Sequence, residues 1–146
     1  MGVIALDQAS KYLVVERLHL DTLGTVHVSP FLNFQMAWNS GVNFGLLGGS
    51  GAFTPWLLLG LTTILGGGLL VASLKAHSLF RATAFGLAAG GAFGNAIDRL
   101  RHGVVADFLN VSCCGLQNPW SFNVADIAIF IGFGMLVWPQ PAARLN

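Results

Sequence analysis

The stretch AFTPWLLLGLTTILGGGLLVASL, residues 52–74, contains no charged side chain. About 20 apolar residues in a helix cross the hydrocarbon core of a bilayer, so this stretch predicts a transmembrane helix. The composition of the whole chain agrees. Of its 146 residues, 54% are hydrophobic and 9% are charged, and the mean hydropathy is +0.68. Soluble domains carry about 25% charged residues. The sequence therefore predicts an all-α integral membrane protein.

Three further stretches are apolar enough to be spans, namely residues 2–18, 82–98 and 122–138. Polar side chains interrupt each of them, and we expect these side chains to face protein rather than lipid. Four transmembrane helices leave no room for a separate soluble domain. Residues 1–146 are therefore expected to form a single membrane-embedded domain.

The connection between the first two spans contains LNFQMAWN, residues 32–39, in which apolar and polar side chains alternate. Alternation with a period of two predicts a β-strand, here at the membrane surface. The glycine-rich segment 39–51 follows it and is expected to approach a bound chain closely. Residues 103–112 are rich in β-branched side chains and predict a second extended segment. A small β element should therefore accompany the helices.

Charge and cysteine content exclude other classes of protein. The net charge is +1 and the seven basic residues are not clustered, whereas nucleic-acid binding needs a basic patch. Cys113 and Cys114 are adjacent and are the only two cysteines, and the four histidines are scattered. This pattern matches no metal-binding motif. We expect no nucleic-acid partner, no metal and no cofactor.

Asp7 and Lys11 lie in the first expected span, four positions apart and therefore on one helical face. A charge inside lipid costs about 2.5–3.5 kcal/mol on insertion scales, so it needs a partner. Opposite charges at this spacing can neutralise each other. We interpret them as a structural pair that holds the first helix against its neighbours, with direct catalysis as the less favoured alternative.

Asn95, Asp98 and Arg99 share one face at the end of the third expected span. One interpretation is a structural ion pair between Asp98 and Arg99 at the helix end. The other is a functional site in which Arg99 is the counter-ion of several aspartates. The residues alone leave both interpretations open.

Asn123 and Asp126 share one face near the start of the fourth expected span, and Asp107 lies in the connection before it. Antiparallel helices with polar faces at one membrane edge would bring Asp98, Asp107 and Asp126 together. Two carboxylates that share one site cannot both ionise cheaply, so one keeps a proton. Such a pair supplies a general base for water and a general acid for a leaving group. The spacing does not decide whether Asp98 or Asp107 is the partner of Asp126.

A different class of protein, a small proton-coupled transporter or channel, would use intramembrane aspartates as relay groups. In that case Asp7, Asp98 and Asp126 should be spread across the depth of the membrane. A peptidase instead requires its aspartates at one edge. The distribution of these carboxylates in the fold distinguishes the two hypotheses.

Several motifs, in order along nearly the whole chain, resemble those of the lipoprotein signal peptidases, also called signal peptidase II. They are DQASK (7–11), NSGVNFG (39–45), GGAFGNAIDRLRHGVVADF (90–108) and FNVADIAIFIG (122–132). The resemblance implies a four-helix aspartic peptidase of the bacterial inner membrane. Its substrates would be prolipoproteins whose cysteine carries diacylglyceryl. The active site would lie at the periplasmic side, with both termini in the cytoplasm, in a protein expected to be a monomer among membrane lipids.

The resemblance also implies roles for single residues. Asp107 and Asp126 match the catalytic pair of the family. Positions that match supporting or substrate-binding residues are Asp7, Lys11, Asn39, Gly41, Asn95, Asp98, Arg99 and Asn123.

Two departures from the family pattern stand out. Only six residues precede Asp7, fewer than the family usually has, so the first helix is expected to be short unless the chain begins upstream. VADF replaces the more usual VVDF beside Asp107. Neither change affects the expected catalytic pair.

Overall fold

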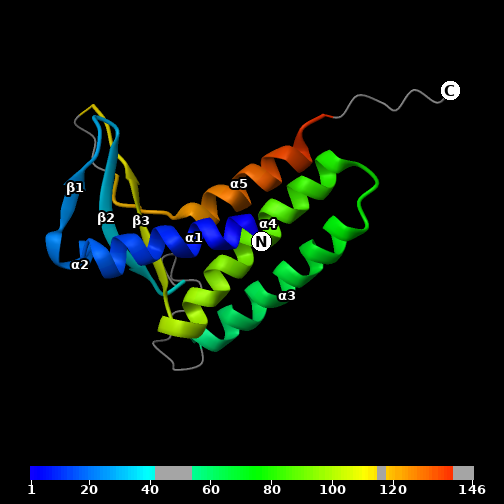
Figure 1. The fold of residues 1–146 in the computed structure, drawn as a ribbon, viewed down its shortest axis with the longest axis horizontal. Helices are drawn as coiled ribbons and strands as arrows, with labels where there is room; N and C mark the ends of the chain where they lie inside the picture. The colour runs from blue at the N-terminus through cyan, green and yellow to red at the C-terminus, as the bar shows by residue number, and fades with distance from the viewer. Residues whose placement is uncertain (42–53, 115–117, 140–146) are drawn as a thin grey trace.

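The computed structural model of the chain describes residues 1–41, 54–114 and 118–139, and in this part the protein is mostly helical with a small antiparallel sheet (Figure 1). Its elements in chain order are α1 (Gly2–Tyr12), one π-helical turn (Leu13–Arg17), α2 (Leu20–Leu23), β1 (Thr25–His27), β2 (Leu32–Asn39), α3 (Thr54–Leu74), α4 (Leu79–His102), β3 (Val105–Val111) and α5 (Val124–Val137).

The four predicted spans correspond to four helical segments. Residues 2–18 form α1 and the π-helical turn, and α3 begins at Thr54 and ends at Leu74, within the predicted 52–74. The third helix is longer than the predicted 82–98 because Ser78 caps its start with a side-chain hydrogen bond from Arg81 N–H, and because it ends at Gly103, in the left-handed conformation. Such capping residues extend a helix beyond its apolar part.

Helix α3 is the helix of the described part that is long and apolar enough to cross a membrane by itself. Its large side chains point outward, with Ile64 74% and Trp56 65% exposed. Helix α5 is equally apolar but has 14 residues, which at 1.5 Å per residue extend over about 21 Å. An apolar, outward-facing surface of this kind matches a lipid environment rather than water.

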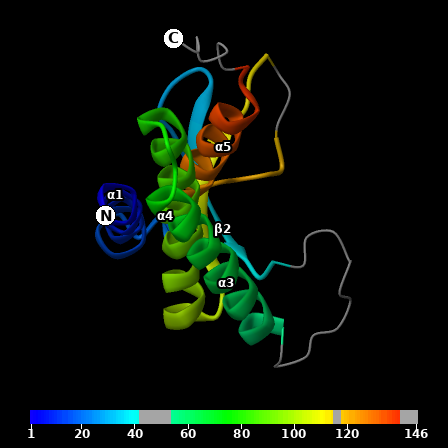
Figure 2. The same cartoon turned by 90° about the vertical axis from the view of Figure 1, so that its right-hand side faces the viewer.

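Helix α4 occupies the centre of the helical layer, in contact with α1, α3 and α5 (Figure 2). Its buried face consists mainly of alanine and glycine. A Cβ atom at Gly91 would collide with the carbonyl oxygen of Ala125, and one at Gly132 would lie 2.6 Å from the carbonyl oxygen of Ala84. Small residues let helix backbones approach closely in membranes, so these glycines hold α5 directly against α4.

The sheet has the strand order β1-β2-β3, and both pairings are antiparallel. Strand β2 has the predicted bounds 32–39, and β3 lies within the predicted extended segment 103–112. The register of β2 and β3 shifts between Phe34 and Ala37. Strand β1 was not predicted, because its three residues are all exposed and show no alternation of burial. The predicted glycine-rich segment 39–51 lies outside the described residues beyond Gly41.

A small apolar cluster attaches the sheet to the N-terminal helices. Val14, Leu20 and Phe108 are buried together, and Phe34 and Met36 of β2 pack against them. The rings of Phe34 and Phe108 meet edge to face with centroids 5.9 Å apart. This cluster fixes β3 relative to α2 and to the π-helical turn that continues α1.

Candidate active site

Asp126 lies in the first turn of α5, where a capping box orients it. Asn123 is the N-cap residue in extended conformation, and its Oδ1 accepts the Asp126 N–H at 2.9 Å. In return, Asp126 Oδ2 accepts the Asn123 N–H at 3.2 Å. This reciprocal pattern satisfies two backbone donors and holds both side chains.

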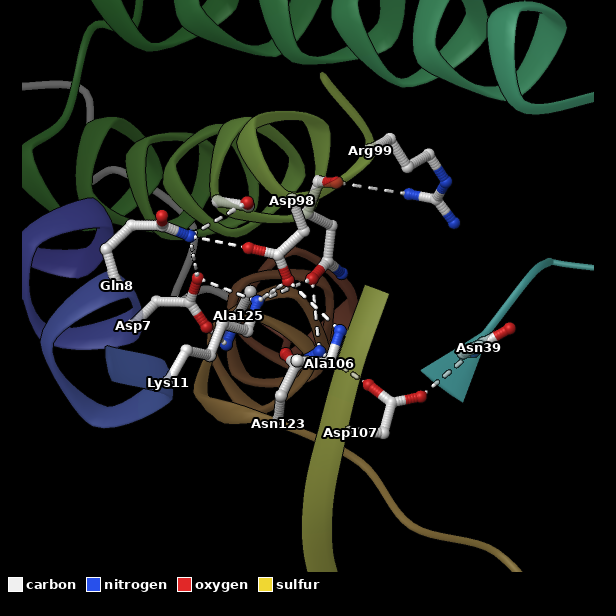
Figure 3. A network of polar contacts seen from close by, with 12 residues as sticks. Asp7, Gln8, Lys11, Asn39, Asp98, Arg99, Ala106, Asp107, Asn123 and Ala125 are labelled. Carbon is white, nitrogen blue, oxygen red and sulfur yellow. Dashed lines mark hydrogen bonds and ion pairs between the residues drawn. The ribbon is translucent and has the colours of Figure 1, made fainter. Parts of the chain in front are cut away.

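Asp107 lies in β3, opposite Ala37 of β2, and its residue is 3% exposed. Its Oδ1 accepts a hydrogen bond from Asn123 Nδ2 at 2.6 Å, and its Oδ2 accepts one from Asn39 Nδ2 at 3.0 Å. Figure 3 shows this carboxyl with Asn39 and Asn123 directed toward it. Asn123 therefore contacts both Asp107 and Asp126.

Asn95 of α4 completes the arrangement. Its Nδ2 donates to Asp126 Oδ1 at 2.8 Å, and its Oδ1 accepts from Asn123 Nδ2 at 3.1 Å and from Lys11 Nζ at 3.2 Å. Each of the four carboxyl oxygens of Asp107 and Asp126 thus accepts one hydrogen bond. Because the donors come from β2, α4 and the start of α5, the fold brings together residues that are distant in sequence.

A second cluster of charges lies beside the first. Lys11 Nζ is 2.9 Å from Asp7 Oδ2 and 2.7 Å from Asp98 Oδ2, and all three residues are at most 5% exposed. Both carboxylates also accept hydrogen bonds from the backbone. Asp7 Oδ1 accepts the Ala125 N–H at 3.0 Å, and Asp98 Oδ2 accepts the Ala106 N–H at 3.2 Å. The predicted pair of Asp7 and Lys11 is confirmed, and it also includes Asp98.

Of the two interpretations of this helix end, the structural ion pair between Asp98 and Arg99 does not form in the described part of the chain, where Asp98 pairs with Lys11. Consecutive residues on a helix point in different directions, and Asp98 reaches Lys11 on α1 while Arg99 extends away from it (Figure 3). Among the described residues Arg99 forms no salt bridge, but Asp126, Asp107 and Asp98 all interact with it electrostatically, so its role as the counter-ion of several aspartates stays a prediction. Within the described part of the chain its guanidinium Nη1 donates one long hydrogen bond, at 3.5 Å, to the carbonyl oxygen of Asn95.

Gly41 lies close to Arg99. Its φ is +80°, a conformation that favours glycine, and a Cβ atom there would collide with Leu58 and lie 3.7 Å from a guanidinium nitrogen of Arg99. Asn39 Oδ1 accepts the Gly41 N–H at 2.7 Å. The turn after β2 is therefore tied to the same side chain that contacts Asp107.

Gln8 is a member of this network that the sequence argument missed. Its Nε2 donates to Asp98 Oδ1 at 2.8 Å and approaches Asp7 Oδ2 at 3.2 Å, and its Oε1 accepts from Arg101 at 3.3 Å. The available signal was its position in DQASK, directly beside a buried aspartate. An uncharged amide inside an apolar helix can therefore indicate a buried polar contact as a charge does.

Burial and the negative charge of Asp126 raise the pKa of Asp107 to about 6, against the opposing hydrogen bonds from Asn39 and Asn123. A carboxyl with this pKa carries a proton over part of the neutral range. Two carboxyls with different preferences for a proton can act as an acid and a base.

No group of His, Cys, Asp and Glu that could hold a metal ion occurs in the described part of the chain.

The fold and these contacts define a membrane protein with a paired carboxyl site. The family model described as "Signal peptidase (SPase) II" matches residues 1–140. A lipoprotein signal peptidase of Methylorubrum extorquens (strain PA1) is 40% identical over 149 residues, which cover 99% of this chain and 85% of that protein. One of Rhodopseudomonas palustris (strain ATCC BAA-98 / CGA009) is 34% identical over 152 residues, covering 98% and 93%.

The fold agrees with these matches. A solved bacterial membrane enzyme, determined by the in meso method at 1.9 Å resolution, has a TM-score of 0.78 and 29% identity, covering 93% of this chain and 85% of that chain. The chain belongs to the signal peptidase II family. It is a membrane-embedded aspartic peptidase that processes prolipoproteins.

The alternative of a proton-coupled transporter or channel is not supported. It required aspartates spread along the membrane normal. Instead, Lys11 connects Asp7 and Asp98 to Asn95, and Asn95 contacts Asp126 directly. The carboxylates form one continuous cluster, as the peptidase hypothesis requires.

Proposed function

We propose that Asp107 and Asp126 form the catalytic dyad of this peptidase and activate water to cleave one peptide bond. The observation that carries the proposal is the shared amide of Asn123, which contacts both residues, at 2.6 Å for Asp107 Oδ1 and 2.9 Å for the Asp126 nitrogen. Asp98 is the other candidate partner, but it forms a salt bridge with Lys11, whereas Asp107 forms none in the described part and shares Asn123 with Asp126. This difference favours Asp107.

The two carboxyls have different environments, which supports different roles. Two hydrogen bonds hold the Asp126 carboxyl in the first turn of α5, so it is suited to take a proton from water. Asp107 is buried and its pKa is raised to about 6, so it is suited to hold the proton. This division corresponds to the pair of proton states that general acid–base catalysis needs.

In this proposal the reaction has two steps, the addition of water to the carbonyl group and the collapse of the tetrahedral intermediate. Asp126 takes a proton from water as the water oxygen bonds to the scissile carbonyl carbon, and Asp107 gives its proton to the carbonyl oxygen. The tetrahedral intermediate collapses as its C–N bond breaks. Asp126 passes its proton to the leaving nitrogen, and a hydroxyl of the intermediate returns one to Asp107. The products are a carboxylic acid and an amine, and the dyad is restored.

The substrate in this proposal is a prolipoprotein whose cysteine carries diacylglyceryl, in the bacterial inner membrane. Four spans, corresponding to α1, α3, α4 and α5, would place both termini in the cytoplasm and the dyad at the periplasmic side, in a monomer surrounded by lipid. The resemblance of the motifs supports this arrangement. Arg99, Asn39 and Gly41 border the dyad, and a guanidinium without an ion-pair partner in the described part is suited to contact substrate carbonyl oxygens.

Cleavage of a purified diacylglyceryl-modified prolipoprotein by the detergent-solubilised protein tests the proposal. Asp107→Asn and Asp126→Asn should each lower the rate by about 10² to 10⁴. Asp21→Asn is the matched control, because Asp21 is exposed on α2 and outside the cluster. Full activity of Asp107→Asn together with loss in Asp98→Asn, in variants that remain folded, would assign the dyad to Asp98 and Asp126 instead.

A further inference from the structure

A cavity of about 830 Å³ lies on the sheet, between the β1–β2 hairpin and the segment that follows β3. Ligand sites in proteins have volumes of about 300–1,000 Å³. The residues that line it are Thr25, His27, Ser29, Pro30, Asn33, Gln35, Asn110, Ser112, Cys113, Cys114, Asn118 and Pro119. None of them is Asp, Glu, Lys or Arg, so the lining offers hydrogen bonds without a fixed charge.

The floor of the cavity is a row of polar side chains across three strands. His27 pairs with Asn33, and Asn33 pairs with Asn110. Residues directly opposite each other in neighbouring strands lie on one face of the sheet. This face therefore presents imidazole and amide groups side by side.

Asn110 and Asn33 have different roles in this row. Asn110 Nδ2 donates to the carbonyl oxygens of Asn118 and Trp120 at 2.7 and 3.0 Å, so it holds the wall of the cavity. Asn33 Oδ1 accepts from His27 Nδ1 at 2.7 Å, whereas Asn33 Nδ2 has no hydrogen-bond partner among the described residues. Asn33 is 8% exposed. No buried side-chain nitrogen or oxygen of the described residues lacks a hydrogen-bond partner, so this unpaired nitrogen is open to the cavity and available to a ligand.

The cavity lies along the strand that carries the proposed catalytic acid. Asn110 follows Asp107 by three residues in β3, which at 3.3 Å per residue is about 10 Å. An extended peptide that runs beside β3 from the dyad covers this distance in about three residues. The cavity is thus within reach of the chain adjoining the scissile bond.

We propose that this cavity binds the main chain of the mature lipoprotein, in the residues that follow the lipid-modified cysteine. The inference rests on the proposed function, because it assumes that Asp107 faces the scissile bond. The apolar signal segment stays beside the outward apolar helices, whereas the mature segment is polar and leaves the bilayer. An uncharged lining of amides, hydroxyls and imidazole is suited to peptide N–H and C=O groups, and Asn33 Nδ2 would donate to one substrate carbonyl.

Two diacylglyceryl-modified substrates of different length test this inference. One carries six residues of mature chain after the cysteine, and the other ends directly after the cysteine as an amide. The wild type should cleave the long substrate with a kcat/KM about fivefold to tenfold higher, mainly through KM, since each neutral hydrogen bond contributes a factor of this order. Asn33→Ala should reduce this preference to about twofold or less.

Gln35→Ala is a second variant, because Gln35 lines the cavity but is exposed, so that its replacement does not disturb the buried row. It should also lower the preference for the long substrate. Equal kcat/KM for both substrates with the wild type, or an unchanged preference in both variants, would overturn the inference. Either result would leave the proposed dyad standing, because Asp107→Asn and Asp126→Asn test the dyad separately, by loss of cleavage of any substrate.

Discussion

The side-chain amide of Asn123 donates to Oδ1 of Asp107 across 2.6 Å and so joins the start of α5 to the middle of β3. The oxygen of the same amide group caps α5 by accepting the backbone N–H of Asp126. One side chain therefore sets the direction of one carboxyl and the helical position of the other. Its role in helix capping and its role in the proposed site are separable by experiment.

Asn123→Ala should weaken both roles. Loss of an N-cap costs about 1 kcal/mol, and Asp107 and Asp126 would lose their common contact, so cleavage should fall at least tenfold. Ser78→Ala is the matched control, since Ser78 caps α4 by accepting the Arg81 N–H, at the end of α4 remote from its site residues. We expect a similar loss of melting temperature in both variants. Equal rates of cleavage in both would mean that Asn123 acts only as a cap.

Helical spacing predicted contacts within a helix but not between helices. The interval from Asp7 to Lys11 identified a pair that the structure contains. The interval from Asp98 to Arg99 suggested another that it does not contain, because Asp98 faces α1 and pairs with Lys11. Which helix packs against a polar face depends on small residues such as Gly91, whose effect is seen only in the packing. The periodicity of the sequence therefore could not predict that Asp98 pairs with Lys11 rather than with Arg99.

Strand β2 was predicted with its correct bounds because large apolar side chains recur at every second position from Leu32 to Trp38. The choice of Asp107 rather than Asp98 came from the family resemblance, since spacing alone left it open. Contacts that span the sequence, such as Asn39 to Asp107, depend on the pairing of β2 with β3. No local pattern specifies that register when a bulge interrupts it.

Removal of Asn39 should shift the pH dependence of cleavage. Its hydrogen bond lowers the pKa of Asp107, against the burial that raises it to about 6. Without this donor the protonated form of Asp107 is favoured further. If protonated Asp107 is the acid, activity falls as pH rises through this pKa. In Asn39→Ala the alkaline limb of log(kcat/KM) against pH should therefore move upward by about one pH unit. A shift toward lower pH would contradict the assignment of the acid.

Lys11→Met should strongly destabilise the protein. It would leave Asp7 and Asp98 buried side by side without a counter-ion, and breaking a buried pair in this way costs about 3–5 kcal/mol. Lys75→Met is the control at an exposed position, where we expect almost no change. Adding Asp98→Asn to Lys11→Met should restore part of the melting temperature, because one uncompensated charge is removed. If the double variant melts lower than the single one, the Asp98 carboxylate is not the unpaired group that destabilises Lys11→Met.

Gly91→Ala should disturb the contact of α4 with α5 and, through it, Asp126. The new Cβ would collide with the carbonyl oxygen of Ala125 and lie 2.7 Å from Ile129 Cγ1, so the first turn of α5 must move. Overpacking of this kind costs about 1–3 kcal/mol, and a shift of Ala125 displaces the neighbouring Asp126 from Asn95. Gly134→Ala, on α5, is the control, since nothing lies within 4 Å of its Cβ position and alanine favours a helix by about 0.5–1 kcal/mol. The melting temperature and the cleavage rate should therefore fall in Gly91→Ala and should not fall in Gly134→Ala. Equal behaviour of the two variants would mean that close approach of α4 and α5 does not position the base.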